Sequence, residues 1–341
     1  MIQRLQYRRY RLPLRAPLRM AHGVVTEREG LIVRLEDEAG RIGWGEAAVL
    51  PWFGTETADE AEAACRELGE KFDAEKLARL PLRLGCLRHA LTAAMAAKVA
   101  VVSAKSLPVA ALLPAGRGVL ERIPPLCEAG FRVFKWKVGV GDLADELALL
   151  DDVCAQLPEG AKLRLDANGA WTRRQAERWL ERTAERPIEY VEQPAFAKPT
   201  AGAALHRQAE DLLLGLARDY PTPIALDESL VGEGDVAHWL QLGWPGVFVV
   251  KLSLCGDVRG VLQQLAAAKA EVVFSSALET GIGAKNVLTQ AFNWTGGTRA
   301  LGFGVWPLFA DGRFDGPAGA PFLRYEDVGR INEEAIWNAL S

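Results

Sequence analysis

Five ionisable residues close successive apolar runs of the chain, and their types suit metal-assisted acid–base chemistry. They are Lys137, Asp166, Glu192, Asp227 and Lys251, and consecutive members lie 24 to 35 residues apart. Each interval accommodates one strand and one helix, the repeating unit of a (β/α) barrel. Three carboxylates brought together would raise one another's pKa unless positive charge compensated them. Oxygen ligands suit a hard ion, so we expect Mg²⁺, with Mn²⁺ as an acceptable substitute.

The elements that must position these residues alternate along the chain from about residue 109. Eight short apolar runs are expected to be strands: Val109–Leu113, Arg132–Val138, Lys162–Asp166, Ile188–Glu192, Ile224–Asp227, Val247–Leu252, Glu271–Ser275 and Ala300–Gly304. Amphipathic patterns between them indicate helices, among them Asp142–Gln156, Arg173–Glu185, Ala203–Asp219 and Asp257–Ala270. Such alternation indicates parallel strands joined by helical crossovers, and eight units indicate a closed barrel.

Side-chain alternation along each expected strand shows which residues share the barrel interior. In Arg132–Val138, Phe134 and Trp136 have one parity, while Lys135 and Lys137 have the other. Because the apolar set packs against the surrounding helices, both lysines are expected to point inward. The same reasoning turns six further residues inward: Arg164, Asp166, Asn168, Glu192, Asp227 and Lys251. A single aspartate at a strand end is more often a helix cap, but the consistent parity of the whole set argues against that interpretation.

Other polar residues near these strand ends are candidates for supporting roles. Arg164 would orient the base or the substrate, or else form an ion pair that fills the barrel. Asn168 would lie behind the metal ligands. Ser275, Ser276 and Glu279 follow the seventh run, where they would contact a substrate carboxylate or cap the next helix.

The first part of the chain has a different pattern. A strand at Leu31–Glu36, a turn and a second strand at Arg41–Trp44 indicate a β meander, and Thr57–Phe72 and Leu87–Lys105 are expected to be helices. We therefore expect an α/β protein with an N-terminal α+β capping domain (1–106), a TIM-like, modified barrel (107–310) and a tail (311–341) that packs back on the cap. The cap loops Arg19–Thr26 and Ala47–Thr55 are expected to close over the barrel.

Composition narrows the class of protein. A net charge of −4 provides no basic footprint for nucleic acid. No run approaches the roughly 20 apolar residues of a membrane helix. Five scattered cysteines without paired spacing favour reduced thiols and a cytoplasmic location. The expected partner is a small-molecule carboxylate, and the oligomeric state stays open.

The strings around these residues resemble the enolase superfamily. They are Lys135-Trp-Lys137, Leu165-Asp166-Ala-Asn168, Tyr190-Val-Glu192-Gln-Pro194, Ala225-Leu-Asp227-Glu-Ser229 and Lys251-Leu-Ser253. The presence of a lysine on both the second and the sixth expected strand resembles the muconate-lactonising subgroup. No His–Asp pair replaces either lysine. Within this subgroup, Phe274-Ser-Ser-Ala-Leu-Glu-Thr-Gly281 and Leu301-Gly-Phe-Gly304 look like the o-succinylbenzoate synthase family. The segment between Glu192 and Asp227 departs from that pattern by its extra length.

The resemblance implies a Mg²⁺-dependent carbon–oxygen lyase of menaquinone or phylloquinone biosynthesis. Its reaction would be the syn dehydration of 2-succinyl-6-hydroxy-2,4-cyclohexadiene-1-carboxylate to 2-succinylbenzoate. Lys137 would be the base and Lys251 the electrostatic partner on the opposite face. The alternative is an N-acylamino acid racemase, or another epimerase or cycloisomerase, in which the lysines exchange acid and base roles. Dipeptide epimerases usually carry Asp-x-Asp where this chain has Gly302-Phe-Gly304. A barrel that only binds a partner, without catalysis, is a further alternative.

Overall fold

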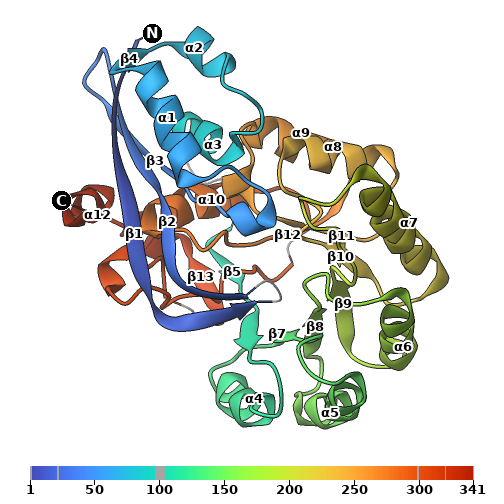
Figure 1. Cartoon of the computed structure of the whole chain (residues 1–341). Coiled ribbons are helices and arrows are strands. Elements are labelled where there is room, and N and C mark those ends of the chain that lie inside the picture. The colour runs from blue at the N-terminus through green and yellow to red at the C-terminus, as the bar shows by residue number, and fades with distance from the viewer. Residues whose placement is uncertain (1, 21–22, 97–103, 298, 319, 341) are drawn as a thin grey trace.

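The computed structural model describes residues 2–20, 23–96, 104–297, 299–318 and 320–340, and it combines an antiparallel sheet with a curled parallel sheet (Figure 1). The antiparallel sheet has the strand order β3-β2-β1-β4. Its strands are β1 (Gln3–Met20), β2 (Gly23–Asp37), β3 (Ile42–Ala47) and β4 (Lys71–Phe72). The long β1 strand was not predicted, and β2 begins well before the expected Leu31. Together they form an extended hairpin at one side of the molecule.

Short helices pack on this sheet and complete the cap: η1 (Pro51–Phe53), α1 (Ala58–Leu68), α2 (Ala74–Ala78) and α3 (Gly85–Met95). The expected helix Thr57–Phe72 therefore ends early and is followed by β4. Residues 97–103 of the expected helix Leu87–Lys105 lie outside the described residues. Helix α3 lies very close to β3, because a Cβ atom on Gly45 would lie 1.9 Å from the carbonyl oxygen of Ala90. Glycine is therefore required at this crossing.

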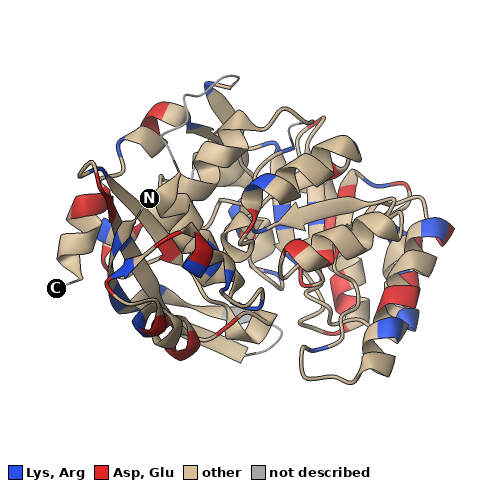
Figure 2. Ribbon diagram, turned by 90° about the horizontal axis from the view of Figure 1, so that it is seen from above, with Lys and Arg blue, Asp and Glu red and all other residues tan. Residues whose placement is uncertain are grey.

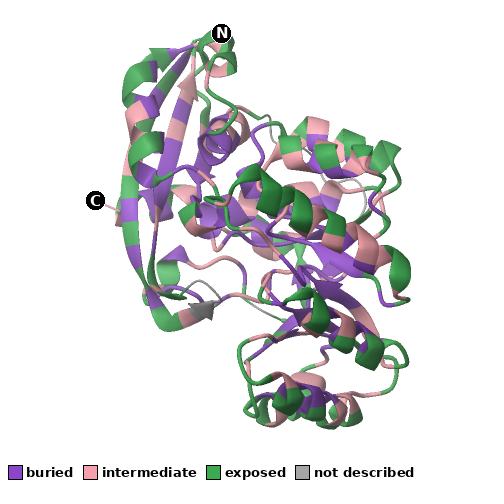
Figure 3. Cartoon of the chain, turned by 45° about the vertical axis from the view of Figure 1, so that its right-hand side comes forward, coloured by how far each residue is buried: buried purple, intermediate pink, exposed green. Residues whose placement is uncertain are grey.

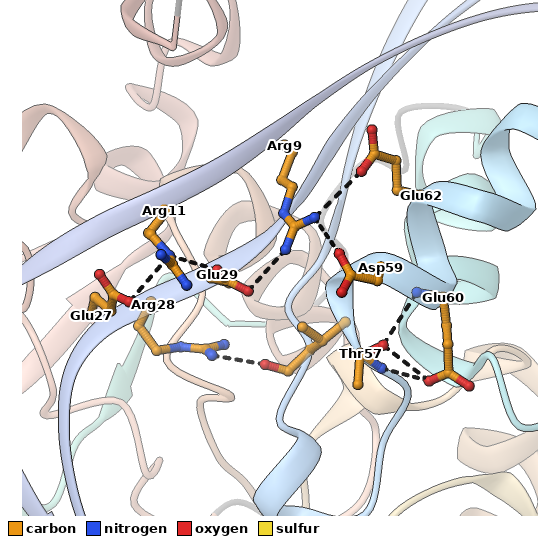
Figure 4. Close-up of polar contacts among 10 residues, drawn as sticks. Arg9, Arg11, Glu27, Arg28, Glu29, Thr57, Asp59, Glu60 and Glu62 are labelled. Carbon is orange, nitrogen blue, oxygen red and sulfur yellow. Dashed lines mark hydrogen bonds and ion pairs between the residues drawn. The ribbon is translucent and has the colours of Figure 1, made fainter.

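The exposed face of the hairpin is held by ion pairs between neighbouring elements (Figure 4). Arg11 pairs with Glu29 at 2.6 Å, and Arg9 reaches both Glu29 and Asp59 of α1. Acidic and basic positions are interspersed over the rest of the chain as well (Figure 2). Exposed pairs of this kind contribute little stability individually. Of the pairs named, only the one between Arg9 and Asp59 joins the hairpin to α1.

The parallel sheet has seven strands in sequential order, from β6 to β12. They are β6 (Ala111–Leu113), β7 (Val133–Lys137), β8 (Lys162–Asp166), β9 (Ile188–Glu192), β10 (Ile224–Leu226), β11 (Val247–Val250) and β12 (Glu271–Phe274). The helices between and after them are α4 (Val119–Glu128), α5 (Leu143–Gln156), α6 (Arg173–Thr183), α7 (Ala203–Asp219), α8 (Glu233–Gln241), η2 (Leu252–Leu254), α9 (Val258–Ala267) and α10 (Gly281–Asn293). Sequential parallel order confirms the predicted βα repeat.

The expected eighth strand, Ala300–Gly304, is reduced to two isolated parallel bridges. Leu301 pairs with Val109 at one edge of the sheet, and Gly302 pairs with Ser275 at the other. A Cβ atom on Gly302 would lie 2.5 Å from Ser275 Oγ, so the backbone approaches closely there. The segment thus joins the two edges and closes the barrel without forming a regular strand.

The burial pattern follows the predicted parity of the barrel strands. Phe134 and Trp136 of β7 are fully buried in the layer between the strands and the helices. A second, smaller apolar cluster lies inside the barrel and consists of Tyr190, Ala225, Val247, Val249 and Val273. Figure 3 shows the strands buried and the outer faces of the helices exposed. Inward positions nearer the carboxyl ends of the strands carry the ionisable residues.

The C-terminal segment contacts both parts of the molecule. It contains η3 (Gly312–Phe314), β13 (Phe322–Arg324), α11 (Tyr325–Gly329) and α12 (Glu333–Ala339), and β13 pairs with β5 (Ser106–Pro108). In α12, Trp337 lies 5.4 Å from Trp44 of the cap, and the Arg8 guanidinium stacks 4.4 Å above the Trp337 ring. None of the described helices is long and apolar enough to cross a bilayer.

Candidate active site

A pocket of about 340 Å³ lies between the carboxyl ends of the barrel strands and the cap. Its barrel side carries Lys135, Lys137, Asp166, Asn168, Asp227, Glu228, Lys251, Ser275 and Ser276, among other residues. Its cap side carries Leu18, Leu50, Trp52 and Phe53. The loop Ala47–Thr55 therefore covers the barrel as predicted. The other predicted cap loop, Arg19–Thr26, is instead mostly strand: residues 19–20 end β1, residues 23–26 begin β2, and Ala21 and His22 lie outside the described residues.

Lys135 holds two of the predicted metal ligands together. Its Nζ atom lies 2.6 Å from Glu192 Oε1 and 3.0 Å from Asp166 Oδ2, on the two strands that follow β7. Burial alone would lower the pKa of Lys135, but the charges of Asp166 and Glu192 outweigh it and raise that pKa well above the ordinary value. Lys135 is therefore a fixed cation and is unsuited to act as a base.

Lys251 has the same relation to the third predicted ligand. Its ammonium group forms a close ion pair with Asp227, which directly follows the neighbouring strand β10. Its Nζ also lies 4.4 Å above the ring centroid of Phe53, a residue of the cap. A cation over an aromatic face is stabilised electrostatically. Lys251 therefore has one carboxylate beside it, that of Asp227, and the apolar ring of Phe53 packed against it.

Lys137 differs from both other lysines. It is the last residue of β7 and is paired in register with Asp166. No described residue forms an ion pair with its ammonium group. Burial lowers the pKa of Lys137, and the Lys135 charge lowers it further, although Asp166 acts in the opposite direction. Burial, rather than the neighbouring lysine, is the main cause of this lowered pKa.

The predicted ligands have the donor chemistry of a cation site. Glu192 is fully buried, and its Oε2 atom has no hydrogen-bond partner. Burial, together with the charges of Asp166 and Asp227, raises the pKa of Glu192 well above the ordinary value despite Lys135. The two lysines thus leave a deficit of positive charge that a hard cation would fill. Among the described residues, however, no three acidic, His or Cys side chains stand at metal-ligand spacing, and lysine ammonium groups contact Asp166 and Asp227 directly.

Glu228 is a pocket residue that the sequence reasoning missed. It is 5% exposed, and its Oε1 atom accepts a 3.0 Å hydrogen bond from Asn168 Nδ2. Burial, with Asp227 and Asp166 nearby, raises the pKa of Glu228 to about 8. Its position immediately after Asp227 was the available signal. Asn168, predicted to lie behind the ligands, instead reaches the pocket wall and contacts this carboxyl group.

The other predicted supporting residues are divided between the pocket and the protein interior. Ser275 and Ser276 line the pocket. Glu279 is buried behind it, where it accepts a 2.8 Å hydrogen bond from Ser276 Oγ, and burial raises its pKa to about 7. Arg164 does not line the pocket: it pairs with Glu189 at 2.6 Å deeper in the barrel and lies 4.9 Å above the ring of Tyr190. The ion-pair alternative describes Arg164 better than a role toward the base.

The longer segment between Glu192 and Asp227 contains α7 and the loop before it. A Cβ atom on Gly54 of the cap would lie 3.3 Å from Cγ of Pro199 in that loop. The extra residues therefore rest on the cap segment that carries Trp52 and Phe53. They add contacts around the lid of the pocket.

Comparison with known proteins identifies relatives of this chain. Residues 2–96 match the family described as "MenC, N-terminal domain", and residues 120–285 match "Enolase C-terminal domain-like". An o-succinylbenzoate synthase of Thermosynechococcus vestitus is 40% identical over 308 residues, which cover 89% of this chain and 92% of that protein. A hydrophobic dipeptide epimerase of Roseobacter litoralis is 34% identical over 292 residues, which cover 78% of this chain and 80% of that protein.

Solved structures agree with these relationships. The o-succinylbenzoate synthase of Thermosynechococcus elongatus, described as complexed with Mg in the active site, superposes with a TM-score of 0.82 at 36% identity. The superposition covers 98% of this chain and 99% of that one. The L-Ala-D/L-Glu epimerase of Bacillus subtilis has a TM-score of 0.79 at 21% identity, covers 94% and 95% of the two chains, and shows a shared fold.

The role of Lys135 leads to a prediction about stability. Replacing Lys135 with Met leaves Asp166 and Glu192 buried without their counter-charge, which should lower the free energy of unfolding by about 3–5 kcal/mol. Urea denaturation in metal-free buffer measures this change. The control is Lys162→Met, at the exposed start of β8. Equal stabilities of the two variants would contradict the assigned role of Lys135.

Proposed function

This chain belongs to the o-succinylbenzoate synthase family, hydro-lyases of the enolase superfamily, and we propose that this pocket performs the family's dehydration. The substrate would be 2-succinyl-6-hydroxy-2,4-cyclohexadiene-1-carboxylate, and the product 2-succinylbenzoate. The observation that carries the proposal is the contrast between the lysines. Lys137 is free of ion pairs with described residues and has a lowered pKa, while Lys251 is ion-paired and directly follows β11, a strand farther around the barrel.

Lys137 acts first as the base. In its neutral form, its Nζ atom takes the proton from the ring carbon that bears the carboxylate. The electrons of that C–H bond move toward the carboxylate and give an enediolate. Because the proton is only weakly acidic, the negative charge must be stabilised as it forms. The cationic Lys251, held by Asp227, contributes positive charge from its own side of the pocket.

The second step expels water. The electrons of the enediolate form the new ring double bond as the carbon–oxygen bond to the hydroxyl group breaks. The Lys137 ammonium returns its proton to the departing oxygen, so the leaving group is water and Lys137 is neutral again. One residue can perform both transfers if the proton and the hydroxyl leave from the same face. The aromatic ring of the product favours this direction.

Asp166, Glu192 and Asp227 would hold the divalent cation, for which Mg²⁺ is the expected ion and Mn²⁺ an alternative. When bound, this ion supplies positive charge to the substrate carboxylate. The chain's own contribution is to bring the three carboxylates to the carboxyl ends of consecutive strands, β8 to β10. Trp52 and Phe53 close the apolar side and exclude water, which strengthens electrostatic interactions within the pocket.

The direct test is an assay of the purified protein with the cyclohexadiene carboxylate and Mg²⁺. We expect 2-succinylbenzoate to form, the activity to disappear after exhaustive chelation, and the activity to return when Mg²⁺ is restored. An N-succinyl amino acid in deuterated buffer serves as the comparison substrate. Racemisation of that compound without any dehydration would contradict the proposed reaction and favour the racemase alternative. Dehydration that survives metal removal would contradict the cation site.

The lowered pKa of Lys137 predicts the pH dependence. Protonated Lys137 cannot accept a proton, so kcat/KM should rise tenfold per pH unit at low pH. The pH at which kcat/KM reaches its plateau should lie below the ordinary lysine pKa of about 10.4, because the pKa of Lys137 is lowered. Lys137→Ala should lower kcat by about 10³-fold and abolish this limb, while Lys162→Ala at the exposed end of β8 should change neither. An unchanged pH profile in Lys137→Ala would assign the base to another residue.

A further inference from the structure

A buried arginine lies directly behind the wall that joins the cap to the barrel. Arg28 of β2 is 1% exposed, while the adjacent Glu27 and Glu29 reach the arginines of β1 on the surface (Figure 4). Its guanidinium donates hydrogen bonds to the carbonyl oxygens of Val49, Ala277 and Leu278 at 2.7, 3.1 and 3.2 Å. None of the described carboxylates forms an ion pair with it. A buried cation held by carbonyl groups alone is costly, so its placement calls for an explanation.

The three carbonyl groups belong to the two segments that form the pocket wall. Val49 precedes Leu50 and Trp52, which line the pocket from the cap. The Arg28 guanidinium also lies 5.4 Å from the ring centroid of Trp52. Ala277 lies between Ser276 and Leu278, which line the pocket from the barrel. Arg28 therefore joins the lid to the loop after β12 without touching the pocket itself.

The loop after β12 has a backbone conformation that needs stabilising contacts such as those of Arg28. Leu278 has a φ of 59°, which is unfavourable for a residue with a side chain. Its N–H group donates a 2.9 Å hydrogen bond to Ser276 Oγ, and its carbonyl group accepts one from Arg28. Both contacts favour the conformation that turns Leu278 and Ser276 toward the pocket. Loss of either contact would allow the loop to relax.

A buried glutamate of the cap holds the other end of the same loop. Glu46 of β3 is fully buried and accepts hydrogen bonds from the N–H groups of Thr280 at 2.9 Å and Gly283 at 3.0 Å. The hydroxyl group of Tyr10 donates a further hydrogen bond at 2.7 Å, and the hydroxyl group of Thr280 donates another. The N–H groups belong to the start of α10, where a negative charge is favourable. Two residues of the cap thus hold the loop. Arg28 donates to carbonyl groups of the loop, and Glu46 accepts from N–H groups at its end.

We propose that Arg28 and Glu46 are positioning residues that clamp the loop 275–280 to the cap and thereby set the shape of the substrate-binding wall. The inference rests on the proposed function, because it assigns this wall to recognition of the cyclohexadiene carboxylate. Lys137, Lys251 and the predicted metal ligands lie on, or directly after, other strands. Weakening the clamp therefore impairs substrate binding more than proton transfer.

The test compares Arg28→Lys with Arg8→Lys. Lysine keeps the charge of Arg28 but cannot donate to three separate carbonyl groups at once. Arg8 is the matched control, since its guanidinium also stacks on an indole and donates to a backbone carbonyl, both of Trp337, and neither residue lines the pocket. Arg28→Lys should raise KM at least about tenfold with a much smaller change in kcat. Arg8→Lys should leave both constants unchanged.

Hydrogen exchange of the free protein supplies a readout that needs no turnover. Segments 49–53 and 275–280 should exchange faster in Arg28→Lys than in the wild type, and should be unaffected in Arg8→Lys. An unchanged KM in a folded Arg28→Lys variant overturns the proposal. If that variant does not fold, Glu46→Gln, which weakens the other end of the clamp, is tested by the same two measurements and criteria. A wild-type protein without dehydratase activity would refute the proposed function, whereas unchanged exchange would refute the clamp.

Discussion

The need to balance negative charge inside the barrel mouth governs this structure. Asp166, Glu192 and Asp227 end or follow adjacent strands, and burial makes their charges expensive. Lys135 and Lys251 compensate part of that charge by direct ion pairs. The remaining deficit, expressed in the raised pKa of Glu192, favours a divalent cation. The same arrangement leaves Lys137 half-buried, without an ion pair to any described residue, and lowers its pKa, so it is suited to take a proton.

This electrostatic arrangement depends on the cap. A site open to water would screen the charges and restore ordinary pKa values. The cap places Phe53 against Lys251 and Trp52 over the pocket, and the segment around Pro199 supports that lid from outside. Buried polar groups join the two parts, so closure of the pocket is a property of the fold rather than of a single loop.

The inward-facing residues were predictable because a strand alternates its side chains with a period of two. That rule placed Lys135, Asp166, Glu192 and Lys251 in the interior, as the structure confirms. The rule did not predict the position of Glu228, because this residue follows the end of β10 and the alternation of a strand does not extend to it. The ion-pair partner of Arg164 could not be predicted either, since parity gives the face of a strand on which a side chain lies but not its depth within the barrel. The strand β1 was missed because its alternation changes phase between Tyr7 and Tyr10.

The cation site formed by Asp166, Glu192 and Asp227 is tested most directly by calorimetric titration of the metal-free protein with Mg²⁺. One ion should bind per chain, and Asp227→Asn should abolish binding while the protein stays folded. Lys137→Ala, which removes the base but no ligand, should retain it. Magnesium binding that is undisturbed in Asp227→Asn, or absent from the wild-type chain, would contradict the assignment of these carboxylates and the account built on them.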